Sequence, residues 1–242
     1  MISTEFSEEL FLCGVKFEVV VIKCDFIKDK IFTFGDFQEA SYVNESIFEY
    51  CINILSDNGY NIKEFTSISC GDMYGESSQF IKVRGCDGIP EYPLYLNTDK
   101  LFYVYGNHDI QLNKEYDNII PLDDIKVLEE GTTIMGFHGI QSSKNKYPSQ
   151  YPNYNSNVKL TLNKLKRNGN NVDIIVTHET PLIDNFDMNT RRIGNKDLEI
   201  EINRYKPKVH IFGHCHFKKS HCVHNDILYI NADSRFILLI PE

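Results

Sequence analysis

The chain has 242 residues, of which 42% are hydrophobic and 24% charged, a composition typical of one globular domain with a sizeable core. Its formal net charge of −9 argues against a protein held to nucleic acid by a broad basic surface. The N-terminal segment carries Glu5, Glu8 and Glu9 where a signal peptide would be basic and then apolar, and no apolar run approaches the roughly 18 residues of a membrane-spanning helix. We therefore expect a single domain over residues 1–242, cytoplasmic and outside the membrane.

The seven cysteines also favour a reducing compartment. Their number is odd, and they show neither CxxC pairs nor a compact disulfide pattern. We expect most of them to be small buried hydrophobic residues.

In the first half of the chain, apolar runs alternate with a helix-like segment. Phe17–Cys24 and residues 31–34 are predicted to be β-strands. Apolar residues then recur at helical spacing from Ile47 to Leu55, behind the possible N-cap Asn44. Two more predicted strands follow, at 67–70 and 101–105.

The second half repeats this alternation. A helix that contains Val158, Leu162 and Leu165 is predicted behind Ser156, and strands are predicted at 173–177 and 209–212. Residues 227–231 and 235–240 are predicted to form a closing hairpin around residues 232–234. Segments 77–97 and 142–157 lack periodicity and are expected to be long surface loops. Strands alternating with helices imply a layered α/β architecture with helices outside a sheet.

Five of the predicted strands end in residues that suit metal ions and phosphate. In sheets of this kind, ligands bind at the carboxyl ends of the strands, so these side chains are expected to meet. Two divalent cations a few ångströms apart would clamp a phosphate ester and activate a water molecule. The strand ends read Gly35-Asp36, Gly71-Asp72, Gly106-Asn107-His108-Asp109, His178 and Gly213-His214-Cys215-His216.

We expect Asp72 to bridge the two ions. Asp36 and His216 would complete one metal site, and Asn107, His178 and His214 the other. A mixture of imidazoles and carboxylates suits manganese, iron or zinc better than calcium, and we favour manganese.

These strand ends, in this order, resemble the calcineurin-like metallophosphoesterase superfamily, whose blocks read D-x-H, G-D, G-N-H-D/E, H and G-H-x-H. The resemblance runs from about Ile31 to the end of the chain, and Thr177–Pro181 and Asn231–Arg235 are similar to small bacterial and viral members. It implies a four-layer sandwich of two β-sheets flanked by helices, with the metals above the strand ends.

The resemblance also implies a mechanism. His108 would protonate or stabilise the leaving oxygen, and Asp109 would orient the His108 imidazole. Hydroxide from metal-activated water would attack phosphorus in line, without a covalent phospho-enzyme.

Two positions depart from the family pattern. Gln38 stands where the family has histidine two residues after the first aspartate, and an amide is a poorer ligand than imidazole. The site of Asp36, Gln38 and His216 is therefore expected to bind its ion more weakly. Gly75 replaces the Asn or Asp of many relatives, which removes a supporting hydrogen bond rather than a ligand.

The predicted function is hydrolysis of a phosphomonoester or phosphodiester. One alternative is a nuclease similar to RNA lariat-debranching enzymes, which also lack the usual histidine. The acidic balance and the absence of cysteine at position 38 disfavour a nucleic-acid substrate. The other alternative is a non-catalytic metal-binding scaffold.

Several further residues have two interpretations. Arg84, Arg191 and Arg192 either bind substrate phosphate or are solvated loop residues. The Tyr- and Pro-rich segment 147–154 either stacks on a base or packs its own loop down. His138 follows a predicted strand and could approach the site, whereas His210, His221 and His224 are not expected to be ligands.

Overall fold

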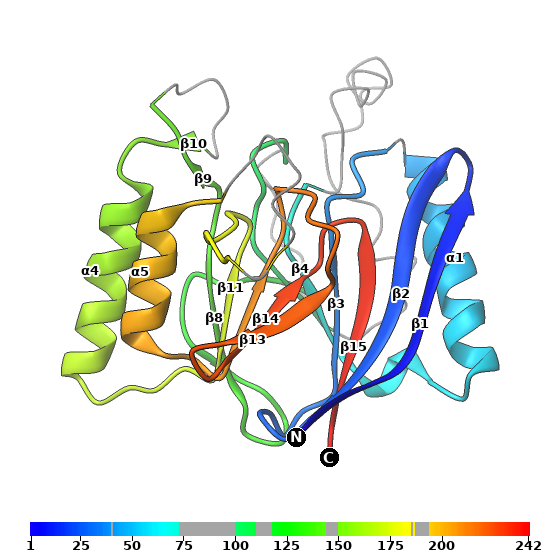
Figure 1. The fold of residues 1–242 in the computed structure, drawn as a ribbon, viewed down its shortest axis with the longest axis horizontal. Helices are drawn as coiled ribbons and strands as arrows, with labels where there is room; N and C mark the ends of the chain where they lie inside the picture. Colours follow the sequence, from blue (N-terminus) through cyan, green and yellow to red (C-terminus); the bar gives the residue numbers. More distant parts are fainter. Residues whose placement is uncertain (40, 73–99, 110–117, 144–149, 185, 187–193) are drawn as a thin grey trace.

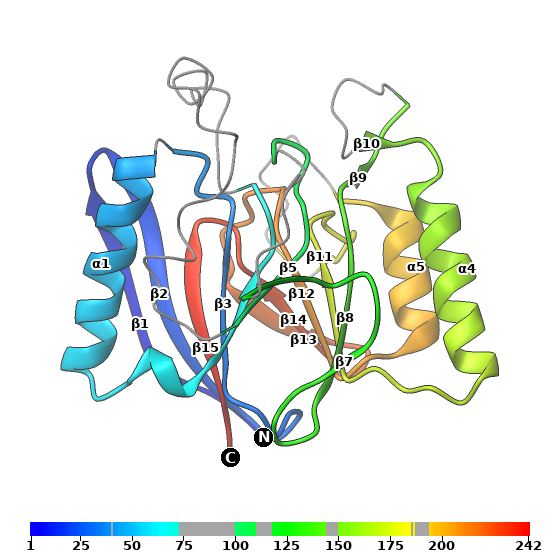
Figure 2. The same ribbon diagram turned by 180° about the vertical axis from the view of Figure 1, so that it is seen from behind.

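The computed structural model describes residues 1–39, 41–72, 100–109, 118–143, 150–184, 186 and 194–242. Two β-sheets pack face to face, with one helix outside the first sheet and two helices outside the second (Figures 1 and 2). The predicted four-layer sandwich of a single domain is therefore confirmed.

The first sheet has seven strands in the order β1-β2-β15-β3-β4-β5-β6. Its centre is mixed, because β15 pairs parallel with β2 and antiparallel with β3, whereas β3, β4 and β5 run parallel. Its strands are β1 (Ile2–Leu12), β2 (Val15–Cys24), β3 (Ile31–Gly35), β4 (Thr66–Ser69), β5 (Leu101–Tyr103), β6 (Ile119–Pro121) and β15 (Arg235–Pro241).

The second sheet has six strands in the order β13-β14-β12-β11-β8-β7. Strands β14, β12, β11 and β8 are parallel, and the two edge strands are antiparallel to their neighbours. Its strands are β7 (Lys126–Val127), β8 (Thr133–Phe137), β11 (Ile174–Thr177), β12 (Val209–Phe212), β13 (His221–His224) and β14 (Ile227–Asn231). A separate short pair consists of β9 (Ile140–Gln141) and β10 (Gln150–Tyr151).

The helices cover the outer faces of the two sheets. Helix α1 (Ser41–Asp57), followed by the 3₁₀ helix η1 (Ile62–Glu64), lies on the first sheet. Helices α4 (Tyr154–Arg167) and α5 (Lys196–Tyr205) lie side by side on the second. In the part of the chain that the structure describes, no helix is long and apolar enough to cross a membrane.

Alternation along the strands produces three hydrophobic layers. In β2, Val20 and Ile22 face the core between the two sheets, while Val19 and Val21 face the core under α1. This is the period of two that a strand buried on both faces requires. In the second sheet, Ile175 of β11 faces the third core, under α4 and α5. The central strands of both sheets are thus buried on both faces, which leaves the strand ends as the place for polar chemistry.

The predicted closing hairpin is wrong. Strand β14 pairs parallel with β12 in the second sheet, whereas β15 pairs with β2 and β3 in the first. Residues 232–234 therefore carry the chain from one sheet to the other, along the rim where the strand ends meet. A short turn between two apolar runs has the same sequence pattern in a hairpin and in a crossover between two sheets. Only the partner strands that are available distinguish the two.

Two predicted helix starts are also corrected. Helix α1 begins at Ser41, so Asn44 lies inside it and donates from Nδ2 to the Glu39 carbonyl instead of capping the helix. Helix α4 begins at Tyr154 with Asn153 as its N-cap, two residues before Ser156. The expected loop 142–157 is accordingly shorter, and it contains β10.

The cysteines behave largely as expected. Cys24, Cys51, Cys70 and Cys215 are buried, Cys13 is exposed and Cys222 is half-buried. All six are free thiols, and Cys86 lies outside the described residues.

Candidate metal centre

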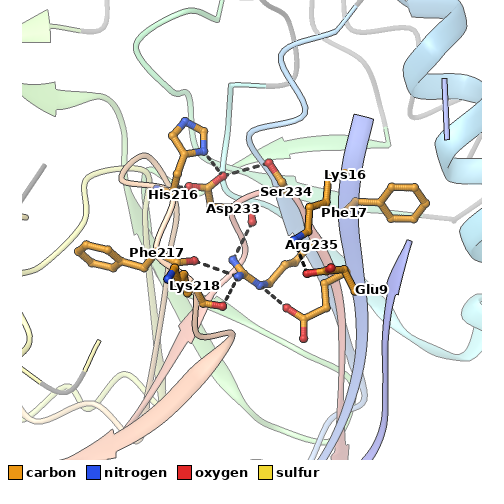
Figure 3. Close-up of a pocket in the computed structure, with 10 residues that line it drawn as sticks. Glu9, Lys16, Phe17, His216, Phe217, Lys218, Asp233, Ser234 and Arg235 are labelled. Atoms are coloured by element: carbon orange, nitrogen blue, oxygen red, sulfur yellow. Dashed lines mark hydrogen bonds and ion pairs between the residues drawn. The ribbon is translucent and has the colours of Figure 1, made fainter. Parts of the chain in front are cut away.

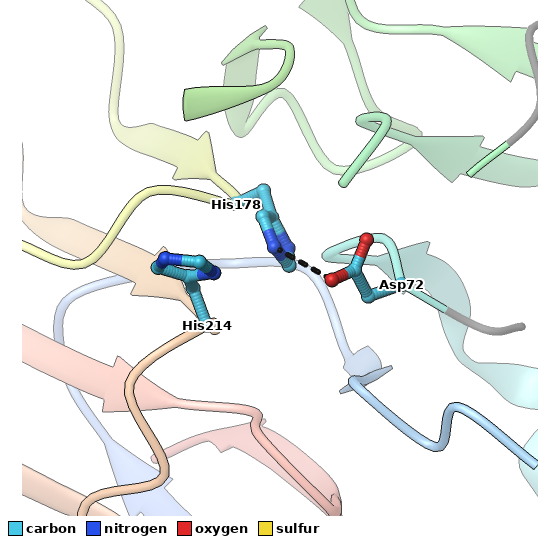
Figure 4. A group of neighbouring side chains, drawn as sticks. All are labelled: Asp72, His178 and His214. Carbon is cyan, nitrogen blue, oxygen red and sulfur yellow. Dashed lines mark ion pairs between the residues drawn. The ribbon is translucent and has the colours of Figure 1, made fainter. Parts of the chain in front are cut away.

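The predicted ligands converge on the rim where strands of both sheets end. Asp36 follows β3 and Asp72 follows β4 in the first sheet, whereas His178 follows β11 and His214 follows β12 in the second. Ligand atoms of Asp72, His178 and His214 all lie within 4.8 Å of one another (Figure 4). Residues more than a hundred positions apart in the chain are therefore joined in one cluster.

His178 is at the centre of this cluster. Its side chain is fully buried, and Nδ1 lies 2.9 Å from the Cys70 carbonyl oxygen. Because a carbonyl can only accept, Nδ1 carries a proton. The other nitrogen, Nε2, lies 3.1 Å from Asn107 Oδ1 and 3.2 Å from Asp72 Oδ2. The carbonyl thus directs Nε2 at the two predicted oxygen ligands.

Asp72 is held by groups from two other segments. Its Oδ1 accepts the His108 backbone N–H at 2.7 Å, and its Oδ2 accepts Gln38 Nε2 at 3.2 Å. The Gln38 backbone N–H also donates to the Asp72 carbonyl at 3.2 Å. Gln38 therefore contacts the carboxylate that we expect to bridge the ions.

Asp36 presents a buried oxygen that has no partner among the described residues. Its Oδ2 accepts the His214 backbone N–H at 3.0 Å, but Oδ1 makes no hydrogen bond within the part of the chain that the structure describes. Buried carboxylate oxygens normally have a partner, so this oxygen is available to accept from a bound cation.

His216 is fixed by a carboxylate that our sequence analysis quoted only as part of a tail motif. His216 Nδ1 lies 2.6 Å from Asp233 Oδ1, and the His216 backbone N–H donates to Asp233 Oδ2. Metal-ligating histidines commonly give their second nitrogen to such a carboxylate, which leaves the first free for the ion. Half of the His216 side chain is exposed.

Four predicted ligands have left-handed backbone conformations. The φ angles are 56° for Asp36, 50° for Asp72, 75° for His214 and 50° for His216. Non-glycine residues seldom adopt such angles, and when they do they cluster at functional sites. The backbone is therefore bent at the residues that the metal chemistry needs.

Two glycines allow the ligand loops to approach one another. A Cβ atom at Gly106 would collide with Asp72 Oδ1, and one at Gly213 would collide with Asp36 Oδ2. These glycines leave room for the carboxylates directly beside neighbouring backbone.

His108 and Asp109 extend this loop. The His108 side chain is half-buried, and its backbone is bound to Asp72. Asp109 Oδ2 accepts the backbone N–H groups of Asp72 at 2.8 Å and Gly106 at 2.7 Å. Asp109 thus ties two ligand loops together, while its orientation of the His108 imidazole stays a prediction.

The carboxyl groups and the imidazole of the cluster shift one another's pKa values. Burial, reinforced by Asp233 and Asp72, raises the pKa of Asp36 well above its usual value despite the opposing His178. Burial also raises the pKa of Asp109, to about 6. Burial alone would lower the pKa of His178, but Asp72 and Asp36 outweigh it and raise this pKa to about 10. Excess negative charge is thus concentrated where the side chains meet.

Comparison with known proteins decides the family. The model of the calcineurin-like phosphoesterase family matches residues 30–218, which include every predicted ligand. The chain belongs to this family. The resemblance in the sequence is thereby confirmed, and the family implies metal-dependent hydrolysis of phosphate esters.

The individual relatives of this chain are distant. A UPF0046 protein of Caenorhabditis elegans, K07C11.7, is 28% identical over 119 residues, which is 48% of this chain and 38% of that protein. The crystal structure of TT1561 of Thermus thermophilus has a TM-score of 0.57 at 11% identity and covers 86% of this chain and 91% of that one. Another crystal structure has a TM-score of 0.58 at 15% identity and covers 85% and 90%. These structures support the fold alone.

The residues gathered at this rim fit a divalent cation. The donors are imidazole nitrogens, carboxylates and an amide oxygen, and Asp36 Oδ1 is an acceptor that a cation would satisfy. Asp72, Asn107, His178 and His214 would hold one ion, and Asp36, Asp72 and His216, with Gln38 alongside, a second.

A cavity of about 320 Å³ adjoins this centre and includes His216 and Asp233 in its wall (Figure 3). Arg235 crosses the cavity wall, donating from Nε to Glu18 Oε2 at 2.7 Å and from Nη2 to the Lys218 carbonyl at 2.7 Å. Its Nη1 donates to the Asp233 carbonyl at 2.9 Å. Arg235 thus links three segments. They are β2 through Glu18, the segment after His216 through Lys218, and the crossover between the sheets through Asp233.

Other predicted residues have different outcomes. Gly75, Arg84, Arg191, Arg192 and the expected loop 77–97 lie outside the described residues. So does part of the 147–154 segment, and Tyr154, the first residue of α4, is buried in the core under α4 and α5. Cys215 joins the core under α4 and α5, so it points away from the metal centre.

Proposed function

We propose that the protein hydrolyses a phosphomonoester or phosphodiester with two bound divalent ions, of which manganese is the best candidate. The observation that carries this proposal is the convergence of Asp72, His178 and His214, whose ligand atoms lie within 4.8 Å of one another. Beside them lies Asp36 Oδ1, which has no hydrogen-bond partner among the described residues. When bound, the ions would supply Lewis acidity and an activated water molecule.

The protein's own side chains have separate roles in this proposal. His108 lies next to the ligand Asn107, where its imidazole can give a proton to the leaving oxygen. Asp109 fixes the loop that carries both residues, through the backbone of Gly106. Asp233 orients His216.

The organic part of the substrate would occupy the cavity beside His216. Its volume of about 320 Å³ is in the range of small-ligand sites. Lys16, Lys218, Glu9 and Glu18 line this cavity together with Ser234, so its wall is polar and carries both signs of charge. This favours a small polar phosphate ester over a nucleic-acid strand, which would need a continuous basic track.

The test is restoration of activity by metal. Protein stripped of metal by a chelator and then given Mn²⁺ should hydrolyse 4-nitrophenyl phosphate or bis(4-nitrophenyl) phosphate. Asp72→Asn should abolish this recovery, whereas Asp226→Asn, whose side chain is 97% exposed, should recover like the wild type. A wild type that stays inactive with manganese, iron, zinc, cobalt and nickel would overturn the proposal.

A variant of His108 separates an enzyme from a metal-binding scaffold. His108→Ala should lower kcat by about 10²-fold or more, the typical contribution of an acid–base residue, while Mn²⁺ content stays at the wild-type level. If the wild type binds Mn²⁺ but shows no turnover, the result favours a non-catalytic metal-binding scaffold over an enzyme.

A further inference from the structure

His138 lies on the turn between β8 and β9, and it contacts the loop that carries Asn107 and His108. Two segments meet at its imidazole. Tyr105, which precedes that loop, lies on one side, and Asp123, which follows β6, lies on the other. The His138 side chain is 15% exposed.

The hydrogen bonds fix the tautomer of this imidazole. The Tyr105 backbone N–H donates to His138 Nδ1 at 2.9 Å. A backbone amide can only donate, so Nδ1 carries no proton and the ring proton is on Nε2. Nε2 lies 2.9 Å from Asp123 Oδ1, which accepts it. Burial lowers the pKa of His138 against the opposing effect of Asp123, and the neutral ring is the form that this geometry needs.

Tyr105 is held on both sides of its backbone. Its carbonyl accepts the Gly139 N–H at 2.7 Å, so the turn containing His138 binds both the N–H and the C=O of this residue. The Tyr105 ring also packs on the His138 ring, with centroids 5.1 Å apart, and its hydroxyl lies 2.8 Å from the Tyr103 hydroxyl. The segment directly before Gly106 is therefore clamped from outside the metal centre.

The clamp continues into the proposed active site. One residue after Tyr105, the Gly106 N–H donates to Asp109, and two residues later the His108 N–H donates to Asp72. A shift of Tyr105 would displace Asn107 and His108 together, because these backbone hydrogen bonds connect them. Displacement of about 1 Å at a catalytic group can cost about 10²-fold in rate.

We propose that His138, oriented by Asp123, is a positioning residue that holds residues 105–108 so that His108 faces the scissile phosphate. This inference rests on the proposed phosphoesterase function. It assigns a role to a histidine and a carboxylate that are not metal ligands. Asp123 is 67% exposed, so its contribution is to hold the ring rather than to stabilise the fold.

Two substitutions at His138 separate positioning from simple packing. His138→Ala removes the acceptor of the Tyr105 N–H, whereas His138→Asn places an amide oxygen near the former Nδ1. With Mn²⁺-loaded protein and 4-nitrophenyl phosphate, His138→Ala should lower kcat about tenfold or more, with KM and Mn²⁺ content changed less than about threefold. His138→Asn should recover most of this loss. The matched control is His224→Ala on β13.

Hydrogen exchange supplies a readout that does not depend on turnover. The peptide covering residues 101–109 should exchange faster in His138→Ala and return toward the wild-type rate in His138→Asn. Faster exchange with unchanged kcat would overturn the inference, and so would a kcat loss that His138→Asn does not reduce. If the wild type has no phosphoesterase activity, the proposed function fails first, and an unchanged exchange rate would then refute the clamp itself.

If His138→Ala does not fold, Asp123→Ala takes its place. It leaves the imidazole and its contact with Tyr105 but removes the acceptor of Nε2–H. The expected result is a smaller loss of kcat in the same direction, and no loss would contradict the assigned role of Asp123.

Discussion

The hydrogen bond at one ring nitrogen of a histidine fixes the tautomer, and the tautomer decides what the other ring nitrogen can bind. In this protein, three histidines are set by three different partners: the Cys70 carbonyl for His178, Asp233 for His216 and the Tyr105 amide for His138. The first two partners accept a hydrogen bond from Nδ1, which leaves Nε2 available for an ion. The third partner instead donates a hydrogen bond to Nδ1. In the proposed function, the same side chain would therefore be a ligand in two places and a positioning group in the third.

Removing Asp233 should weaken one metal site. Asp233→Ala leaves His216 Nδ1 without its carboxylate, so the ring loses its fixed tautomer and direction. Partners of this kind typically contribute 10- to 100-fold in metal affinity, and we expect a loss of about that size at the weaker site. Calorimetric titration of metal-free protein with Mn²⁺ measures it, with Asp226→Ala as the exposed control. Equal affinities for Asp233→Ala and the wild type would show that His216 is not a ligand.

Gln38→His should have the opposite effect. Gln38 already contacts Asp72 Oδ2 at 3.2 Å, and an imidazole at this position restores the family's usual ligand. We expect half-maximal activity at a lower Mn²⁺ concentration, as shown by titration of turnover. An unchanged titration curve would place residue 38 outside the coordination of either ion.

At the scale of elements, strand β15 connects the core to the site. Arg235 at its start supports the crossover, and the next residue, Phe236, is fully buried among phenylalanines under α1. Its ring centroid lies 4.6 Å from that of Phe37 and 4.7 Å from that of Phe48. Strand β15, which lies between β2 and β3 in the first sheet, thus also holds the crossover that carries Asp233.

Truncating Phe236 should destabilise the whole fold. Phe236→Ala removes a ring that packs on several others and leaves a cavity, at a cost of about 3–5 kcal/mol in the free energy of unfolding. The control Phe11→Ala, whose side chain is 74% exposed, should change it by less than about 0.5 kcal/mol. Urea denaturation measures both. A cost for Phe236→Ala as small as that for Phe11→Ala would contradict the packing described.

The elements differ in how well the sequence predicts them. Apolar runs such as 174–176 are recognisable because both faces of the strand are buried. Strand β1 was missed because its pattern is half-exposed, broken by a register shift between Thr4 and Phe6, and rich in glutamate. The hairpin prediction failed because a local turn does not specify which sheet the next strand joins.

The same limit applies to the site. The gathering of these side chains could be predicted because a polar residue directly after a strand, in most cases preceded by glycine, is a local signal. Asp233 lies 17 residues from His216, and Asp123 lies 15 residues from His138, with no motif linking either pair. These contacts exist only because the sheets bring the segments together, so sequence periodicity could not reveal them.

At the scale of the whole molecule, one buried histidine makes the fold sensitive to acid. His210 on β12 is fully buried, its Nε2 lies 2.9 Å from Thr177 Oγ1, and burial lowers its pKa to about 3. The unfolded chain binds this proton below its ordinary pKa of about 6.5, and the folded chain does not. Stability therefore falls as pH drops from about 6.5 toward about 3, and this contribution is constant above about 6.5.

Replacing His210 should reduce that sensitivity. Between pH 7 and pH 5, the histidine should account for about 2 kcal/mol of the lost unfolding free energy. We expect His210→Phe to show a correspondingly smaller difference between the two pH values, as measured by urea denaturation at each. This comparison of the change in unfolding free energy between pH 7 and pH 5 holds even if the variant is less stable than the wild type at both pH values. An equal change in unfolding free energy for the variant and the wild type would mean that His210 is protonated in the folded state.

The most direct test of the whole account is the position of bound metal. An anomalous-scattering map of crystals grown with Mn²⁺ should show one peak among Asp72, Asn107, His178 and His214, and a second, weaker peak beside Asp36 and His216, with Asp72 between them. Manganese bound elsewhere, or the absence of any peak at Asp72, would contradict the assignment of this rim as the metal centre.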